Sequence, residues 1–134
     1  MQLADWYKPH RRAQLAVRGL AQRRQGGARA VLIQGPPGAG KTAFGEALAE
    51  GSGAALVFSQ CHEWTDADEL YVGVDVASAV AGDADAVREP GVLAQAAEAS
   101  HHGLVVLVID ELDKASERTE HLLLDVLPSG RVPV

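Results

Sequence analysis

Apolar positions along the chain form two patterns: short continuous runs, and longer stretches with helical spacing. The runs are rich in Val, Ile and Leu and are bounded by turn residues, which is typical of buried strands. In the stretches an apolar residue recurs every three or four positions, which is typical of amphipathic helices. The sequence therefore predicts strands over Ala30–Gln34, Ala54–Ser59 and Leu104–Ile109, helices over Pro9–Gln25, Lys41–Glu50, Ala67–Val80, Val92–Ser100 and from Ser116 to Leu127, and a polar loop over Gly82–Pro90.

The order of these elements predicts the fold class. Strands alternate with helices, which indicates an α/β fold with a parallel sheet. The run Leu104–Ile109 is apolar throughout, as expected for a central strand that is covered on both faces. The chain has 134 residues, 47% of them apolar, which is enough for one domain with a hydrophobic core.

The composition argues against a secreted protein and against a membrane protein. The single cysteine, Cys61, cannot form an intrachain disulfide, which argues against a disulfide-stabilised secreted domain. No apolar run approaches the roughly 20 residues of a membrane-spanning helix, and the chain does not open on a signal-peptide pattern. We therefore expect a soluble, cytoplasmic protein that makes no membrane contact.

Charge is divided unevenly along the chain. Residues 1–30 carry seven of the 12 Lys and Arg and one of the 18 acidic residues. This predicts a basic N-terminal helical segment (1–30) ahead of an acidic core (31–134). The segment either contacts nucleic acid or another subunit, or is a solvated helix face attracted to its own acidic core. No aromatic residue is interleaved with its arginines, which favours the second interpretation, so we expect no nucleic-acid partner.

A glycine-rich stretch carries the clearest chemical signal. Gly35 to Thr42 has the pattern Gly-x-x-x-x-Gly-Lys-Thr, between a predicted strand and a predicted helix, which indicates a phosphate-binding P-loop. Its glycines let the backbone N–H groups turn inward around phosphates at a helix N-terminus. Lys41 is expected to reach the β- and γ-phosphates, and the Thr42 hydroxyl to bind Mg²⁺. The residues expected to contact the nucleotide are Gly35, Pro36, Pro37, Gly38, Ala39, Gly40, Lys41, Thr42 and Ala43.

A second signal ends the third predicted strand. Asp110 and Glu111 follow the run Leu104–Ile109 directly. In parallel sheets ligands bind beyond the carboxyl ends of the strands, so both carboxylates are expected near the phosphates. Asp110 is placed to hold Mg²⁺, directly or through water. Glu111 is placed to orient or deprotonate an attacking water, so Glu111 and Lys41 are the candidate catalytic residues.

These two motifs, Gly35–Thr42 and Val108–Ala115 (Val-Ile-Asp-Glu-Leu-Asp-Lys-Ala), resemble those of the AAA+ ATPases, closest to the MoxR-like group or the Clp-type unfoldases. The resemblance implies a P-loop, three-layer α/β/α core with strand order 5-1-4-3-2, ATP and Mg²⁺ as cofactors, and a homo-oligomeric ring, a hexamer, in the full-length form. The chain supplies strands 1–3 of that core. The strand-4 sensor, the arginine finger and the lid have no counterpart here, so we expect a truncated product or a fragment, nearly inactive alone.

One short segment between the motifs suggests a contact with protein substrate. Tyr71-Val72-Gly73 is similar to the triplet with which Clp-type unfoldases grip a threaded polypeptide. The sequence departs from that pattern at Leu70, where those enzymes usually have glycine, and at Val74, where they usually have an acid. The alternative is that Tyr71 and Val72 only pack a helix.

Three functions are compatible with these motifs. The first is an AAA+ ATPase that remodels protein partners when full length. The second is a P-loop kinase acting on a small molecule. The third is a non-catalytic nucleotide-binding fragment. The pair Asp110-Glu111 favours water as the phosphoryl acceptor and therefore the ATPase.

Overall fold

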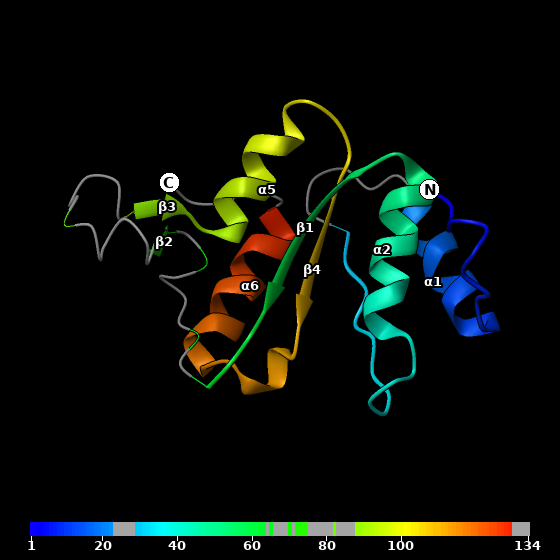
Figure 1. The fold of residues 1–134 in the computed structure, drawn as a ribbon, viewed down its shortest axis with the longest axis horizontal. Coiled ribbons are helices and arrows are strands. Elements are labelled where there is room, and N and C mark those ends of the chain that lie inside the picture. Colours follow the sequence, from blue (N-terminus) through cyan, green and yellow to red (C-terminus); the bar gives the residue numbers. More distant parts are fainter. Residues whose placement is uncertain are drawn as a thin grey trace.

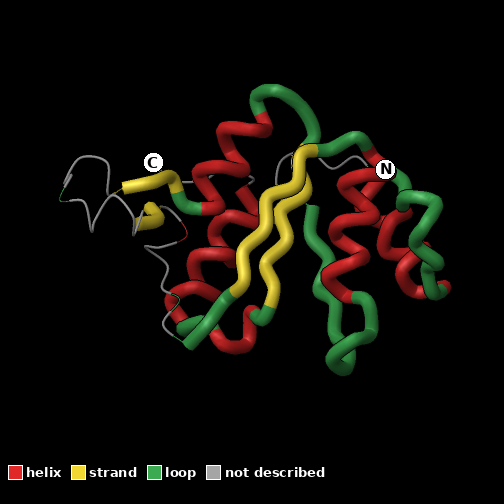
Figure 2. Tube along the Cα trace, viewed as in Figure 1, coloured by secondary structure: helices red, strands yellow, loops and turns green. Residues whose placement is uncertain are grey.

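A two-stranded parallel sheet lies at the centre of the computed structural model, with helices on both sides of it (Figures 1 and 2). The structure describes residues 1–22, 29–63, 65, 70, 72–74, 82 and 88–129. The elements in chain order are α1 (Arg11–Ala21), α2 (Lys41–Ser52), β1 (Ala55–Gln60), β2 (Val72–Val74), β3 (Arg88–Pro90), α5 (Val92–Ser100), β4 (Val105–Asp110), the 3₁₀ turn η1 (Leu112–Lys114) and α6 (Glu117–Ser129).

The central sheet pairs β1 with β4, which confirms the second and third predicted strands. Each begins and ends one residue later than predicted. The register runs from Ala55 opposite Val105 to Gln60 opposite Asp110. Because the strands are parallel, their polar last residues meet at one edge of the sheet. That edge is where the predicted site was expected.

The sheet lies between two helical layers. Successive residues of a strand point to opposite faces, and β4 follows this rule. Val106 and Val108 pack in the cluster that contains α2, whereas Leu107 packs with residues of α5 and α6. The described residues therefore form the expected α/β/α arrangement, and the α/β P-loop fold class is confirmed.

Helix α2 packs against β4 by its apolar face. Phe44, Ala47 and Leu48 are buried. A methyl group built on Gly45 would fall well inside the contact distance of the Val108 side chain, so the helix approaches the strand more closely than an alanine there would permit. The helix runs two residues past its predicted end and stops at Gly53, which has a φ of 62°.

Helix α1 is shorter than predicted at its start. His10 accepts the N–H of Arg12 through its side chain and caps the helix, so α1 begins at Arg11 and Pro9 lies outside it. The helix also ends earlier than predicted, because Gln22 is extended, and residues 23–25 of the predicted helix lie outside the described residues. Leu20 joins the core cluster of α2, with Ala13, Ala16 and Val17 packed against it. The division into residues 1–30 and 31–134 stays a prediction.

The first predicted strand, Ala30–Gln34, does not form a strand in the structure. These residues belong to neither of the two sheets found among the described residues, and Leu32 is 75% exposed. A strand needs a neighbour that accepts and donates its backbone hydrogen bonds. In the order 5-1-4-3-2, strand 4 stands between strands 1 and 3, so this segment and β4 are not expected to pair directly. Figure 1 shows the segment as an unpaired cyan trace.

Two further predictions are wrong for the residues that the structure describes. Val72–Val74 was predicted to be helical and forms β2, and Arg88–Pro90 was predicted to be loop and forms β3. The two strands pair antiparallel, with Val72 opposite Pro90. β-Branched valines favour this extended conformation, and the distant partner completes its hydrogen bonds. The remaining residues of the predicted helix lie outside the described residues, apart from Leu70, which is buried.

The opposite helical layer follows the sequence closely. Helix α5 has its predicted bounds, and α6 begins at Glu117, one residue after the predicted start at Ser116. The carbonyl oxygen of Ser116 accepts the N–H groups of Thr119 and Glu120. Helix α6 continues through Pro128 to Ser129, two residues past its predicted end at Leu127.

Candidate functional site

The glycine-rich loop leads directly into the N-terminus of α2. Gly38 and Gly40 have φ angles of 78° and 86°, in the left-handed region that favours glycine. The carbonyl oxygen of Gly40 accepts the N–H of Phe44 at 3.0 Å, which forms the first turn of the helix. Among the described residues, the N–H groups of residues 41–43 donate no backbone hydrogen bond. A helix N-terminus with free N–H groups attracts anions, phosphates above all.

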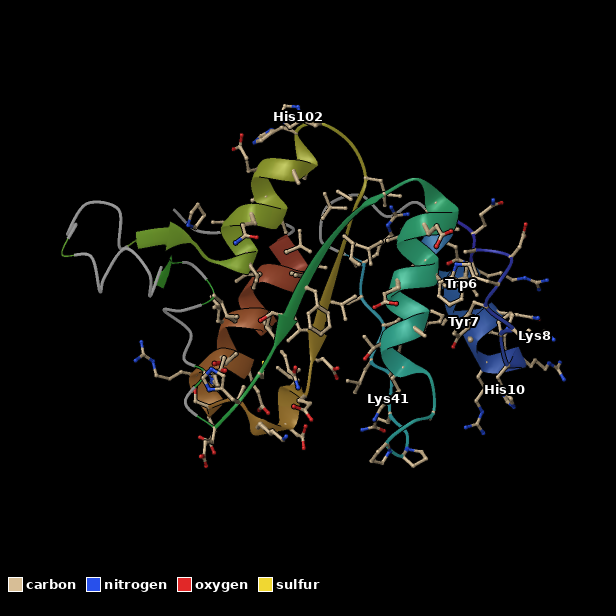
Figure 3. All side chains as sticks on the ribbon, viewed as in Figure 1. Trp6, Tyr7, Lys8, His10, Lys41 and His102 are labelled. Atoms are coloured by element: carbon tan, nitrogen blue, oxygen red, sulfur yellow. The ribbon has the colours of Figure 1, made fainter. Side chains whose placement is uncertain are left out.

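The side chain of Lys41 bonds to its own loop. Its Nζ donates to the carbonyl oxygen of Gly35 at 2.6 Å and spans the loop from end to beginning. Figure 3 shows Lys41 at the end of α2 that faces the loop. To reach a phosphate the ammonium group has to exchange this carbonyl oxygen for a phosphate oxygen. The exchange favours the phosphate, because a charged acceptor forms the stronger hydrogen bond.

Helix α2 and strand β4 bring Thr42 and Asp110 together. The hydroxyl of Thr42 donates to Oδ2 of Asp110 at 3.0 Å, although the two residues are 68 positions apart. The second carboxylate oxygen of Asp110 accepts the N–H of Glu111 at 2.8 Å, which fixes the orientation of the group. The close packing at Gly45 sets the separation of the two elements and therefore this contact. The two predicted metal ligands thus lie at one point.

Glu111 occupies a conformation that its residue type seldom adopts. Its φ of 54° makes it the one non-glycine residue with positive φ in the described ranges. Both of its carboxylate oxygens have partners. Gln60 donates to Oε2 at 2.9 Å from the end of β1, and Lys114 forms an ion pair with Oε1 at 3.0 Å. The carboxylate is therefore held between the adjacent strand and the following 3₁₀ turn.

These contacts shift the titration of Glu111 and its neighbours. The hydrogen bond from Gln60, followed by that from Lys114, lowers the pKa of Glu111. The same ion pair raises the pKa of Lys114. Cys61 is buried beside this edge, and burial, with smaller effects from Asp110 and the neighbouring acids, raises the pKa of its thiol. At neutral pH Glu111 is therefore ionised and the Cys61 thiol is protonated.

The structure adds three residues that the sequence analysis did not identify. Gln60 could have been found, because it follows the second predicted strand and so lies at the ligand-binding edge. Lys114 could also have been found, because it stands three positions after Glu111. Tyr7 gave no signal: its hydroxyl lies 3.5 Å from the carbonyl oxygen of Gly40, 33 positions away. Of the residues predicted to grip substrate, Val72 and Gly73 lie in β2, and Tyr71 lies outside the described residues.

Comparison with known families agrees with this geometry. The family model described as AAA domain (dynein-related subfamily) matches residues 30–134, from the start of the unpaired segment to the last residue. The chain belongs to the AAA domain family. This confirms the resemblance to AAA+ ATPases, and an AAA domain is an ATP-binding P-loop module.

A relative supports the same family over a short stretch. The AAA chain is 49% identical over 41 residues to ATP-dependent zinc metalloprotease FTSH 12, chloroplastic, of Arabidopsis thaliana. The match covers 31% of this chain and 4% of that relative's length. No solved structure matches the chain significantly. Among the described helices, none is both long enough and apolar enough for a membrane span.

Proposed function

We propose that this AAA domain binds ATP with Mg²⁺ and that the full-length protein hydrolyses ATP to remodel protein partners. The observation that carries the proposal is the contact between Thr42 and Asp110. It joins the N-terminus of the loop helix to the carboxyl end of β4 at 3.0 Å. An anion-binding helix end and a fixed carboxylate therefore meet at one place, which is the arrangement that a nucleoside triphosphate and its cation need.

The residues at this place fit Mg²⁺. Thr42 and Asp110 offer a hydroxyl and a carboxylate oxygen, and Mg²⁺ prefers hard oxygen ligands, usually one or two from the protein beside waters and phosphates. Both oxygens come from rigid elements, since one lies in the first turn of α2 and the other ends β4. When bound, Mg²⁺ would neutralise charge on the β- and γ-phosphate oxygens.

The remaining groups have separate roles in the proposal. The N–H groups at the start of α2 (residues 41–43) surround the phosphates, and Lys41 leaves the carbonyl oxygen of Gly35 to bind the β- and γ-phosphates. Glu111 orients the attacking water or accepts its proton. Its lowered pKa keeps it ionised at neutral pH, which the role requires, while its two partners restrain its position.

Two alternative functions make different predictions. A small-molecule kinase would transfer the phosphoryl group to an organic acceptor, and a non-catalytic domain would bind nucleotide without turnover. Adjacent carboxylates at Asp110 and Glu111 favour water as the acceptor. Assays of phosphate release and of phosphorylated product in the full-length protein separate the three.

The remaining parts of the proposal rest on the family. AAA proteins typically form oligomeric rings, and we propose a hexamer for the full-length form, MoxR-like or Clp-type, acting on proteins in the cytoplasm. We further propose that Tyr71, Val72 and Gly73 grip a polypeptide substrate. The extended conformation of the two residues that the structure describes supports this role over helix packing, because the alternative requires a helix here. Val72 and Gly73 lie in the three-residue strand β2.

Calorimetry with Mg·ADP and Mg·ATP tests the central proposal. We expect the wild-type chain to bind both nucleotides and Lys41→Ala to lose at least about tenfold in affinity, because a charge-assisted hydrogen bond is worth about 1.5–3 kcal/mol. Arg12→Ala, which removes an exposed positive charge from α1, is the control and should bind normally. Equal affinity of the wild type and Lys41→Ala would rule out this phosphate site.

A further inference from the structure

The first eight residues form an N-terminal strap (Met1–Lys8) that runs along α2. The N–H and the carbonyl oxygen of Gln2 both bond to the Ser52 hydroxyl at 3.1 Å, at the C-terminal end of the helix. The N–H of Ala4 donates to the carbonyl oxygen of Ala47 at 2.9 Å. Figure 3 shows Trp6 and Tyr7 of the strap alongside α2. The strap thus follows α2 from its C-terminus toward the phosphate loop.

A glycine of α2 makes this close contact possible. A side chain at Gly51 would collide with the backbone of Gln2, Leu3 and Ala4. Ala4 is buried by the contact, and the indole N–H of Trp6 donates to Glu50 Oε2 at 2.7 Å. The strap is therefore packed onto the helix by backbone and side-chain contacts together.

The strap ends on the phosphate loop through Tyr7. Its hydroxyl lies 3.5 Å from the carbonyl oxygen of Gly40, and the hydroxyl oxygen and ring atom Cε2 would each lie 4.0 Å from a Cβ built on that glycine. The ring also packs edge-on against Phe44, with centroids 6.0 Å apart. Within the described part of the chain, the other hydrogen bonds of loop residues 35–40 are made among themselves or with Lys41 and Phe44. Tyr7 is thus an external support of the loop.

Such a support matters because the loop is rich in glycine. Glycines lose the most conformational freedom when a loop becomes ordered. In an unsupported loop this loss of entropy opposes phosphate binding. A group that holds the loop in its bound conformation lowers this cost. The ring provides most of the support, because 3.5 Å is long for a hydroxyl hydrogen bond, whereas the edge-on contact with Phe44 has favourable geometry. Phe44 lies in the first turn of α2 and donates its N–H to the carbonyl oxygen of Gly40, so the ring holds the loop through this turn.

We propose that Tyr7 is a positioning residue for nucleotide binding: it holds Gly40, and through it Lys41 and Thr42, in the phosphate-binding conformation. The inference rests on the proposed function, because it needs a nucleotide at the loop. Coupling between two sites is reciprocal, so a bound nucleotide must also stabilise the strap. The strap then becomes a part of the domain whose order depends on nucleotide.

Calorimetry on three variants tests the role of Tyr7. Tyr7→Ala removes the ring and should weaken Mg·ADP binding about two- to tenfold, the value of one aromatic contact. Tyr7→Phe keeps the ring and should restore nearly all of the affinity. Trp6→Phe is the matched control, because it removes the hydrogen bond to Glu50 while it keeps an aromatic ring beside Tyr7, and it should bind like the wild type. Urea unfolding without nucleotide measures the stability of each variant.

Hydrogen exchange on the wild type tests the reciprocal effect without any mutation. Mg·ADP should slow exchange of the Ala4 amide, which bonds to α2. Any one of three results would overturn the inference: unchanged exchange of the Ala4 amide, wild-type affinity in Tyr7→Ala, or an equal loss of affinity in Trp6→Phe. If one of these results is found while the wild type binds nucleotide and Lys41→Ala loses affinity, the inference fails but the proposed function still stands. If the wild type binds no nucleotide, both proposals fail.

Discussion

The close approach of α2 to β4 can be tested with a single methyl group. Gly45 lies in α2 against Val108, and a Cβ there would be 3.6 Å from two atoms of that side chain and much closer to a third, Cγ2. Valine is stiff at χ1, so it has little freedom to turn away. Restoring the ordinary separation of about 3.5–4.0 Å requires a movement of about 1 Å by the helix or the side chain.

Two opposing effects set the expected stability of Gly45→Ala. Replacing glycine by alanine inside a helix stabilises by about 1 kcal/mol, whereas inserting a methyl group into a packed contact costs about 1–3 kcal/mol. We therefore expect a net loss of about 1 kcal/mol in the free energy of unfolding. Gly19→Ala in α1 is the control, because nothing lies within 4 Å of a Cβ at that position, and it should be stabilised.

The same movement should damage the site. The hydroxyl of Thr42 is 3.0 Å from Asp110, and an added separation of about 1 Å would take the pair beyond hydrogen-bond distance. A misplacement of this size can cost on the order of a hundredfold in a catalysed rate. Binding of Mg·ATP should therefore weaken in Gly45→Ala, with a smaller effect on ATP without Mg²⁺.

Urea unfolding and calorimetry measure both effects, and a second substitution checks the cause. Val108→Ala removes the colliding atoms, so Gly45→Ala should be less damaging in that background, with a coupling energy of about 0.5–3 kcal/mol. If Gly45→Ala were stabilised as much as Gly19→Ala, or if Val108→Ala gave no relief, the packing argument would be refuted.

Three further predictions concern the edge of the sheet. Asp110→Asn should weaken Mg²⁺-dependent nucleotide binding. Glu111→Gln should retain binding but lose turnover in the complete assembly, and a wild-type rate in this variant would show that Glu111 has no catalytic role. Gln60→Ala should raise the pKa of Glu111, measured by NMR titration. Because the folded state lowers this pKa, the stabilisation from Gln60 and Lys114 is present above the unfolded-state pKa and is lost as pH falls through the folded-state value. Buried Cys61 should react with iodoacetamide far more slowly in the folded chain than in urea, and equal rates would contradict its burial.

The sequence alone determined the features that neighbouring residues encode. The spacing of Gly35, Gly40 and Lys41 specifies a loop at a helix start, and helical periodicity identified α2 and α5. The continuous apolar run before Asp110 identified a strand with packing on both faces and located both carboxylates at its end. These predictions succeeded because periodicity and turn chemistry act over a few residues, within one element.

The tertiary structure decided whatever depends on a distant partner. Val72–Val74 became a strand because Arg88–Pro90 pairs with it, and the apolar residues 30–34 did not, because they have no strand beside them among the described residues. The hydrogen bond from Gln60 to Glu111 and the contact of Tyr7 with Gly40 join positions 51 and 33 apart. Pairing of β1 with β4 and packing of the strap on α2 create these contacts, and no local pattern in the sequence carries that information.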